Sequence, residues 1–195
     1  MENTKDYIIE EAFKLFLTHT YEGVSISKLS DAIGMTKGAL YHHFKNKEEL
    51  FRMVVDKYLD FPEINADLET ISLYEYIQLS VVHAEKVISS LFQYSNVYTP
   101  LDYLSLVAGA FRHYTDYANI KGKFINNEIE KIAVVLKNAI KSNEIRDDIN
   151  IELVASNFFS INIGLAGNLV RNYPLEETIN MLKEQNFEFY KLLKK

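Results

Sequence analysis

The stretch SISKLSDAIGMTKGALYHHFKNK, residues 25–47, decides the fold. Ser25 and Thr36 are residues that commonly cap a helix N-terminus, and apolar residues follow each of them at helical spacing. Gly34 is expected to end the first of these helices, because the residue after a helix often needs a positive φ. The stretch therefore predicts two short helices joined by a tight turn. This geometry places a second helix in the DNA major groove.

The second of these helices, expected over 36–45, has one apolar side. At roughly 100° per residue, Leu40 and Phe44 lie together and face the core. Gly38 and His42 then point away from the core, where a glycine lets the helix approach a duplex closely. The outward side is completed by Tyr41 and Lys45. These polar side chains can bond to phosphates or to base edges, which indicates a DNA-contacting face.

Two further helices flank this pair. The first is expected to begin at Thr4, and the fourth at Asn46 as N-cap, with Glu49 as its capping-box partner. Ser25 and Lys47 stand at the starts of flanking helices, where free N–H groups and the helix dipole favour a phosphate oxygen. The sequence predicts a DNA-binding domain over 1–45 and a second domain over 46–195, with 46–60 as a connecting helix.

The composition supports an all-α fold. The 195 residues include only 7 glycines and 3 prolines, few for a protein with many β-turns. The absence of cysteine excludes disulfides and thiolate chemistry. The net charge is −6, yet the segment from Gly23 to Lys47 holds four lysines and one acid. No apolar run approaches the ~20 residues of a membrane span, and no signal peptide is visible, so a cytoplasmic protein is expected.

Longer helices are predicted beyond the first domain. They are expected over 72–92, from Thr99-Pro100, over 122–142, over 150–171 and after Pro174. The helix at 150–171 is apolar nearly all round, so it needs packing partners on both sides.

The segment from Gly34 to Phe44, followed by Asn46-Lys47-Glu48-Glu49-Leu50, closely resembles the signature of the TetR/AcrR family of bacterial repressors. The resemblance covers roughly the first fifty residues. It departs from the usual pattern at Thr20, where a glycine is common, and at Ser30 and Ile33. It implies a regulator that binds double-stranded operator DNA, with these DNA-contacting positions: Ser25, Thr36, Lys37, Gly38, Tyr41, His42, Lys45 and Lys47.

The resemblance also implies a larger C-terminal helical domain for ligand binding and dimerisation. The family's last two long helices usually form a four-helix bundle with a second subunit, and here they are expected at 122–142 and 150–171. The residues expected at this homodimer interface are Ile129, Leu136, Phe158, Ile161, Leu165 and Leu169.

An unknown small, largely apolar effector is expected to release the repressor from DNA. Aromatic residues suit a pocket for such a ligand. The candidate lining residues are His83, Phe92, Tyr94, Tyr103, Phe111, His113, Tyr114 and Tyr117. For each of them, ordinary core packing is the alternative.

Other functions have less support in the sequence. No Walker loop, dinucleotide-binding turn, HExxH motif or di-iron motif is present, so neither catalytic residues, nor a cofactor, nor a metal site are expected. A metal-responsive regulator using His83 and His113, or a helical protein–protein adaptor without DNA binding, remain the alternatives.

Overall fold

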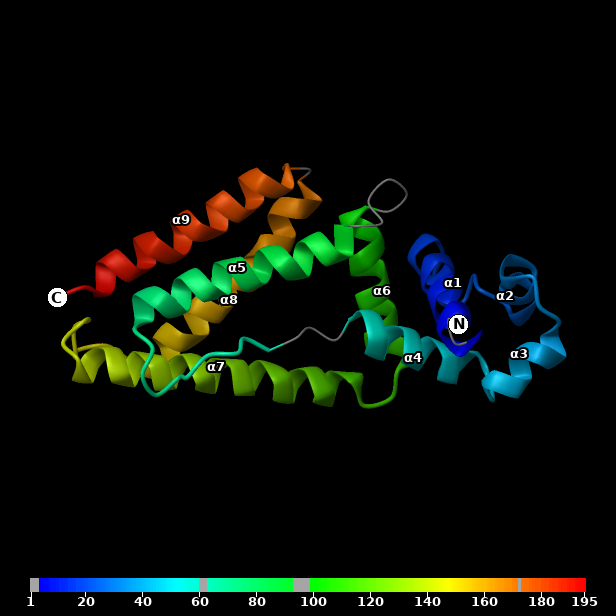
Figure 1. Ribbon diagram of the computed structural model, residues 1–195, viewed down its shortest axis with the longest axis horizontal. Helices are drawn as coiled ribbons and strands as arrows, with labels where there is room; N and C mark the ends of the chain where they lie inside the picture. The colour runs from blue at the N-terminus through cyan, green and yellow to red at the C-terminus, as the bar shows by residue number, and fades with distance from the viewer. Residues whose placement is uncertain (1–3, 60–62, 93–98, 172) are drawn as a thin grey trace. The chain divides into compact units, whose positions relative to one another are not determined.

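The computed structural model describes residues 4–59, 63–92, 99–171 and 173–195 (Figure 1). Within these residues the chain forms nine α-helices, and the β-pairing there is a single bridge between Ile145 and Lys194. The all-α fold predicted from the sequence is confirmed. The helices fall into two compact units, which are described separately.

The first unit is built from the N-terminal helices and α6, together with the first residues of α7. Its complete helices are α1 (Thr4–Thr18), α2 (Ile26–Ile33), α3 (Lys37–His43), α4 (Lys47–Tyr58) and α6 (Pro100–His113). Helix α1 packs against α2, α4 and α6, and α2 packs against α3. The compact unit is thus larger than the expected domain over 1–45.

Local side-chain chemistry defines the ends of α2, α3 and α4. The side chains of Ser25, Thr36 and Asn46 each accept a hydrogen bond from the backbone N–H three residues on, at 3.1, 3.2 and 2.8 Å. Gly34 follows α2 with φ of 71°, which a glycine adopts without strain. Glu49 accepts a hydrogen bond from the backbone N–H of Lys45 at 2.6 Å. The predicted N-caps Ser25, Thr36 and Asn46 therefore form, whereas the Glu49 carboxylate bonds the N–H of the residue before the N-cap and not that of Asn46 itself.

The core of this unit fixes the orientation of α3. Leu40 and Phe44 are buried against residues of α1, α2 and α4. Helix α3 ends at His43, before the predicted end at Lys45, because Phe44 adopts an extended conformation with φ of −141°. This change of direction lets the Phe44 ring enter the core, and its N–H still bonds the carbonyl of Leu40 at 3.1 Å.

Helices α4 and α6 belong to the same core as α1. Phe51 and Val54 of α4 are buried together with Leu106 and Ala110 of α6. The Phe51 ring also meets Phe16 of α1 edge-on, with ring centres 4.9 Å apart. The N-terminal helices are consequently packed on a scaffold that includes α6.

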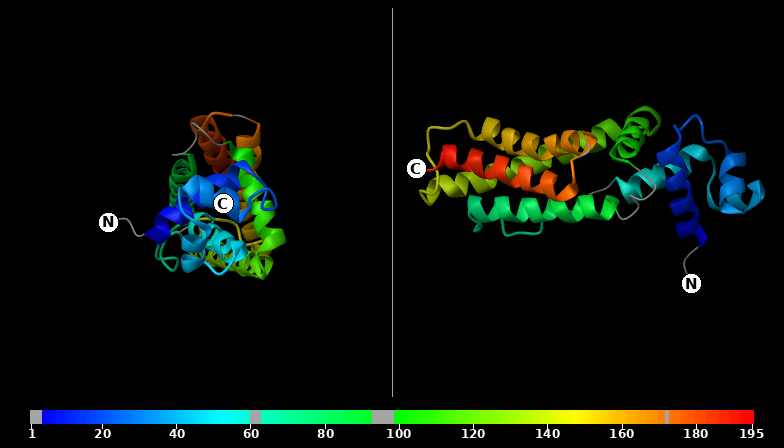
Figure 2. Two further views of the ribbon diagram at one scale, coloured as in Figure 1. Left: turned by 90° about the vertical axis from the view of Figure 1, so that its right-hand side faces the viewer. Right: turned by 90° about the horizontal axis from the view of Figure 1, so that it is seen from above.

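The second unit contains the four longest helices of the described chain. They are α5 (Leu73–Phe92), α7 (Tyr117–Lys141, of which the part from Lys121 belongs here), α8 (Ile151–Val170) and α9 (Leu175–Leu193). Figures 1 and 2 show them side by side, and α9 packs against both α5 and α8. The Glu144 carboxylate accepts hydrogen bonds from the N–H groups of Leu73 and Tyr74 and from the Tyr190 hydroxyl, at 3.0, 2.9 and 3.0 Å.

The structure corrects part of the expected dimer interface. Leu136 and Phe158 are 0% and 3% exposed within the single chain, so neither can line a surface for a second subunit. The reason lies in α9. The Phe189 ring of α9 packs on the Phe158 ring with centres 4.8 Å apart, and so covers this side of α8 within one chain.

Candidate nucleic-acid interface

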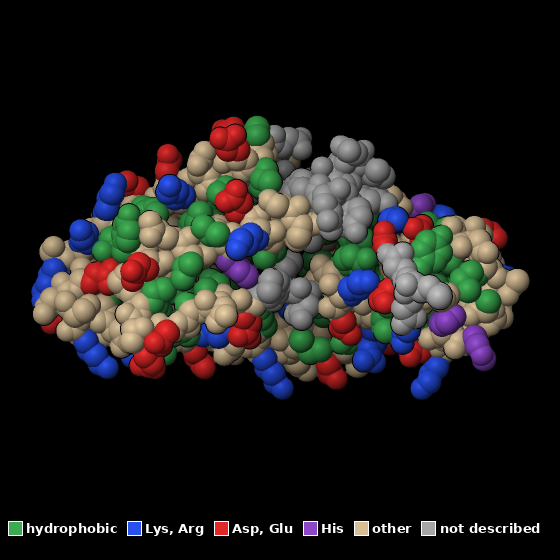
Figure 3. All heavy atoms as spheres, viewed as in Figure 1, with side chains coloured by type: hydrophobic (Ala, Val, Ile, Leu, Met, Phe, Trp, Pro, Cys, Tyr) green, Lys and Arg blue, Asp and Glu red, His purple; other side chains and the backbone are tan. Residues whose placement is uncertain are grey.

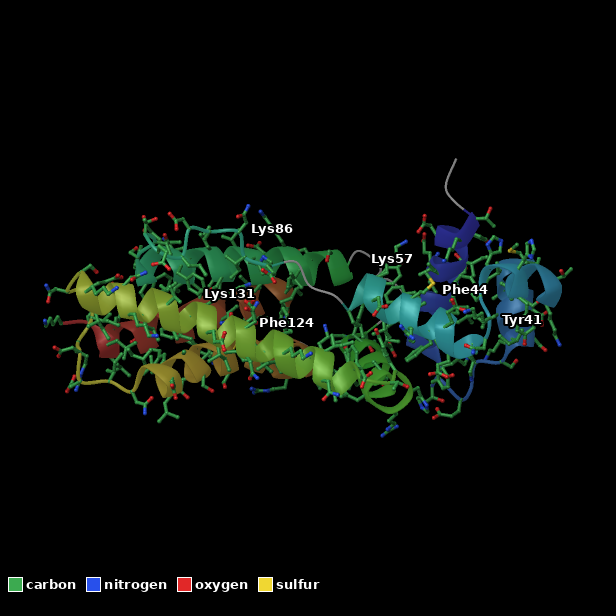
Figure 4. The ribbon with its side chains drawn as sticks, turned by 90° about the horizontal axis from the view of Figure 1, so that it is seen from below. Tyr41, Phe44, Lys57, Lys86, Phe124 and Lys131 are labelled. Atoms are coloured by element: carbon green, nitrogen blue, oxygen red, sulfur yellow. The ribbon has the colours of Figure 1, made fainter. Side chains whose placement is uncertain are left out.

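The outward side of α3 is formed by Gly38, Tyr41 and His42, all of which are exposed. Tyr41 is 52% exposed, whereas its neighbour Leu40 is 3% exposed. Figure 4 shows Tyr41 on α3, with Phe44 closer to α1 and α4. The helix therefore separates packing residues from residues that are available to a partner, as its periodicity predicts.

The surroundings of α3 add positive and titratable side chains. Ser25, Thr36, Lys37 and Lys45 are exposed, and Lys47 is half-buried. Figure 3 shows basic side chains, Lys or Arg, and histidine side chains at the surface of this unit. Ser25 caps α2, and the other seven sequence-predicted positions lie on α3, on its flanking turns or at the start of α4, all within one unit.

Lys47 is held in place by a residue from the turn after α1. Its ammonium donates a hydrogen bond to the backbone carbonyl of Tyr21 at 2.8 Å and lies 3.9 Å from the centre of the Tyr21 ring. Burial lowers the pKa of Lys47, and the negative charge of Glu22 opposes this shift. The charge expected to meet a phosphate is thus fixed near the N-terminus of α4.

Tyr21 in turn contacts the last residue of α6. The imidazole of His113 stacks on the Tyr21 ring, with centres 4.2 Å apart and an interplanar angle of 17°. His113 Nε2 lies 2.7 Å from a carboxylate oxygen of Glu22. Sequence reasoning did not identify this group, because no local spacing connects α6 with the turn after α1.

Residues 8–54 match the sequence model of a family described as "Bacterial regulatory proteins, tetR family". The match contains α2, α3 and the caps that orient them. The N-terminal segment of the chain is thus similar to the DNA-binding domain of TetR-family regulators.

Two curated proteins that are similar to this chain are named as a repressor and a negative regulator. The HTH-type transcriptional repressor ComR of Escherichia coli (strain K12) is 45% identical over 56 residues, which cover 29% of this chain and 27% of ComR. The negative regulator IcaR of the biofilm operon icaADBC, from Staphylococcus epidermidis, is 36% identical over 67 residues, or 32% of this chain and 36% of IcaR. The chain thus matches about a quarter to a third of the length of these relatives.

Solved structures share the fold over nearly the whole chain. The repressor MexZ of Pseudomonas aeruginosa superposes with a TM-score of 0.71 at 17% identity, covering 100% of this chain and 96% of MexZ. A SmeT–triclosan complex superposes with a TM-score of 0.65 at 15% identity, covering 95% and 90%. At these identities the likeness concerns the fold, and it includes the C-terminal helices.

The candidate ligand residues are divided between the two units. His83 lies half-buried on α5 in the second unit, whereas Tyr103, Phe111, His113, Tyr114 and Tyr117 lie in the first. Tyr117 belongs to the core of the first unit, and Tyr103 and Tyr114 pack against that core. The side chain of Phe92 and the whole of Tyr94 lie outside the described residues.

Of the other four residues expected at the dimer interface, the side chains of two are described and those of two are not. Ile129 and Ile161 are half-buried, and the side chains of Leu165 and Leu169 lie outside the described residues. Among the described side chains of α8, Leu153 and Ile163 are the exposed large apolar ones, at 64% and 55%.

Two other findings concern alternative functions. In the part of the chain that the structure describes, no three His, Asp or Glu side chains gather as a metal site. No described helix has the length and apolar character needed to cross a membrane. Separately, an open groove of about 690 Å³ between α5 and α9 is lined by apolar and charged side chains together, among them Val81, Ile179 and Phe187 beside Glu85, Glu176 and Lys183.

Proposed function

We propose that this chain is a transcriptional regulator that binds operator DNA as a homodimer, with α3 in the major groove. The observation that carries the proposal is the two-sided character of α3. Leu40 and Phe44 anchor the helix in the core, and Gly38, Tyr41 and His42 face outward from a helix-turn-helix with formed caps. The TetR-family match over residues 8–54 supports it.

The outward residues have different roles in this proposal. Lys47 and the N-terminus of α4 contact phosphate, a contact that fixes register without reading sequence. His42 and Tyr41 stand on the exposed side of α3, where an imidazole or a phenol can hydrogen-bond to a base edge. Gly38 carries no side chain, so the backbone of α3 can approach the duplex closely.

The homodimer is proposed to form through the exposed side of α8. Leu153 and Ile163 present apolar surface on this helix, and such surface is costly to leave in water. Light scattering of the wild type at micromolar concentration tests this step. A dimer that Leu153→Glu or Ile163→Glu dissociates supports it, and a monomeric wild type contradicts it.

Repression and release by a small, largely apolar effector are the finer part of the proposal. The matched relatives are repressors by name, and the SmeT structure that shares this fold is a complex with triclosan. An effector weakens DNA binding only if it prefers the DNA-free conformation. A coupling of about 1–3 kcal/mol is typical, so saturating effector should lower operator affinity by roughly 5- to 150-fold.

Selection of bound DNA from a random pool tests the DNA-binding function. The expected result is one enriched sequence with two related half-sites, bound tightly by the wild type in a fluorescence-anisotropy titration. The double variant Tyr41→Ala/His42→Ala should lose this binding. Tyr74→Ala, which removes a 45% exposed tyrosine from α5, is the matched control and should bind as the wild type does. Failure to enrich any sequence would contradict the proposal.

A further inference from the structure

The last residue of α6, His113, closes a chain of contacts that ends at Lys47. It pairs with Glu22 at 2.7 Å and stacks on Tyr21 at 4.2 Å. Tyr21 contacts the Lys47 ammonium both through its carbonyl, at 2.8 Å, and through its ring, at 3.9 Å. These four residues, Tyr21, Glu22, Lys47 and His113, are called the α6 clasp below.

The α6 clasp contains a histidine that is open to solvent on one side. The His113 side chain is 25% exposed, so protons reach it from solvent. An open cavity of about 420 Å³ lies beside it and is lined in part by Tyr21, Glu48 and Asp116. Histidine is the side chain whose ordinary titration falls between pH 5 and 8. Protonation turns the hydrogen bond to Glu22 into a full ion pair.

Other charged and titratable groups surround the clasp on each neighbouring element. In the turn after α1, His19 contacts the Thr18 hydroxyl at 2.8 Å. Burial raises the pKa of Tyr21, and the negative charge of Glu48 on α4 raises it further. Also on α4, Arg52 lies 5.0 Å from the centre of the Tyr114 ring, and Asp56 hydrogen-bonds with the Tyr114 hydroxyl. Following α6, the cavity is bordered by Arg112, Tyr114, Asp116 and Tyr117.

The charge on Glu22 affects Lys47 directly. The Glu22 carboxylate attracts the Lys47 ammonium and favours its charged form. Its own pKa is lowered, first by a hydrogen bond from its backbone N–H and then by His113. When His113 is protonated, it neutralises Glu22, so the protein attracts Lys47 less and a phosphate competes for the ammonium more easily. The imidazolium also adds positive charge to the unit that carries α3.

We propose that the α6 clasp makes DNA affinity depend on pH, with His113 and Tyr21 acting as positioning residues for Lys47. The inference rests on the proposed DNA-binding function. Acid tightens DNA binding, because protonation of His113 neutralises Glu22 and so leaves the Lys47 ammonium more available to a phosphate. Raising the pH removes the ion pair and weakens binding.

Anisotropy titrations of the full chain on its selected operator, at pH 5.5 and pH 8.0, test the proposal. The wild type should bind more tightly at pH 5.5. In His113→Gln, the ratio of the affinities at pH 5.5 and pH 8.0 should be about two- to fivefold smaller than in the wild type, the range that a partly exposed ion pair supports. Glu22→Gln should have the same effect, and the double variant should show no larger loss than either single one. His19→Gln, in the same turn, is the matched control and should leave the change intact.

Two variants of Tyr21 test whether the effect passes through the ring. Tyr21→Phe keeps the ring and the backbone carbonyl, so the pH dependence should persist. Tyr21→Leu keeps the Glu22–His113 pair but removes the ring beneath Lys47, so it should weaken DNA binding at both pH values and leave the change with pH in place. If His113→Gln and the wild type share one pH dependence, the clasp proposal is wrong while DNA binding stands. If the wild type binds no DNA at either pH, the proposed function fails and the clasp proposal fails with it.

Discussion

Replacing Leu40 by alanine should separate the packing side of α3 from its outward side. Leu40 is 3% exposed and is the buried residue within α3, a helix of 7 residues. A helix this short has little stability by itself, so its conformation depends on the core contact that Leu40 makes. The exposed neighbour Tyr41 provides the matched control, because Tyr41→Ala removes a larger side chain from the surface of the same helix.

The expected magnitude follows from burial. Truncating a buried leucine to alanine costs about 2–5 kcal/mol, from lost transfer free energy and the cavity that remains. A middle value of about 3 kcal/mol corresponds to a roughly 150-fold change in an opening equilibrium. Tyr41→Ala should alter stability by no more than about 0.5 kcal/mol, as is usual for a surface substitution.

Hydrogen exchange of the full-length protein measures this difference at the helix itself. The reporter amides are those of Leu40 and Phe44, which bond to carbonyls at 3.1 Å in the native helix. Leu40→Ala should speed their exchange by about two orders of magnitude, and Tyr41→Ala by less than about threefold. Equal effects of the two substitutions, or slow exchange in Leu40→Ala, would show that α3 is not held by its apolar side.

Three further predictions concern a cap, a charge and a buried hydroxyl. Ser25→Ala removes the N-cap of α2 and should cost about 1 kcal/mol in urea unfolding, whereas a loss below about 0.3 kcal/mol would argue against the cap. Lys47→Ala should lower the log–log salt slope of DNA binding by about 0.9 on operator and scrambled DNA alike, and an unchanged slope would exclude a phosphate contact. Burial and the hydrogen bond to Glu144 raise the pKa of Tyr190 to about 12, above its ordinary 10.0. The protonated Tyr190 hydroxyl therefore contributes fully to stability below pH 10, and this contribution is lost as the pH rises toward 12. Glu144→Gln should make the tyrosinate absorbance of Tyr190 appear at lower pH, and an unshifted titration would contradict the role of Glu144.

The features that the sequence predicted correctly are those fixed by neighbouring residues. The caps Ser25 and Thr36, the turn at Gly34 and the apolar pair Leu40 and Phe44 all act within a few residues of their own helix. Their chemistry leaves few alternative local structures, so the spacing alone was informative.

The features that the sequence did not predict depend on contacts between distant segments. An apolar helix side does not reveal whether it will meet its own chain or a second one, and Phe158 proved to be covered by Phe189 of α9. His113 was a candidate ligand contact, yet it packs on Tyr21 and Glu22. No periodicity encodes such pairings, because they arise only when the core of the first unit brings α6 beside the turn after α1.

If the outward side of α3 reads DNA sequence, His42 is the residue whose removal should reveal it. The measurement is an anisotropy titration of wild type and His42→Ala on the selected operator and on scrambled DNA at one salt concentration. The substitution should cost about 1–3 kcal/mol on the operator, a roughly 5- to 150-fold loss of affinity, and leave binding to scrambled DNA nearly unchanged. Equal losses on both DNAs, or no loss on the operator, would contradict sequence reading by this side of α3.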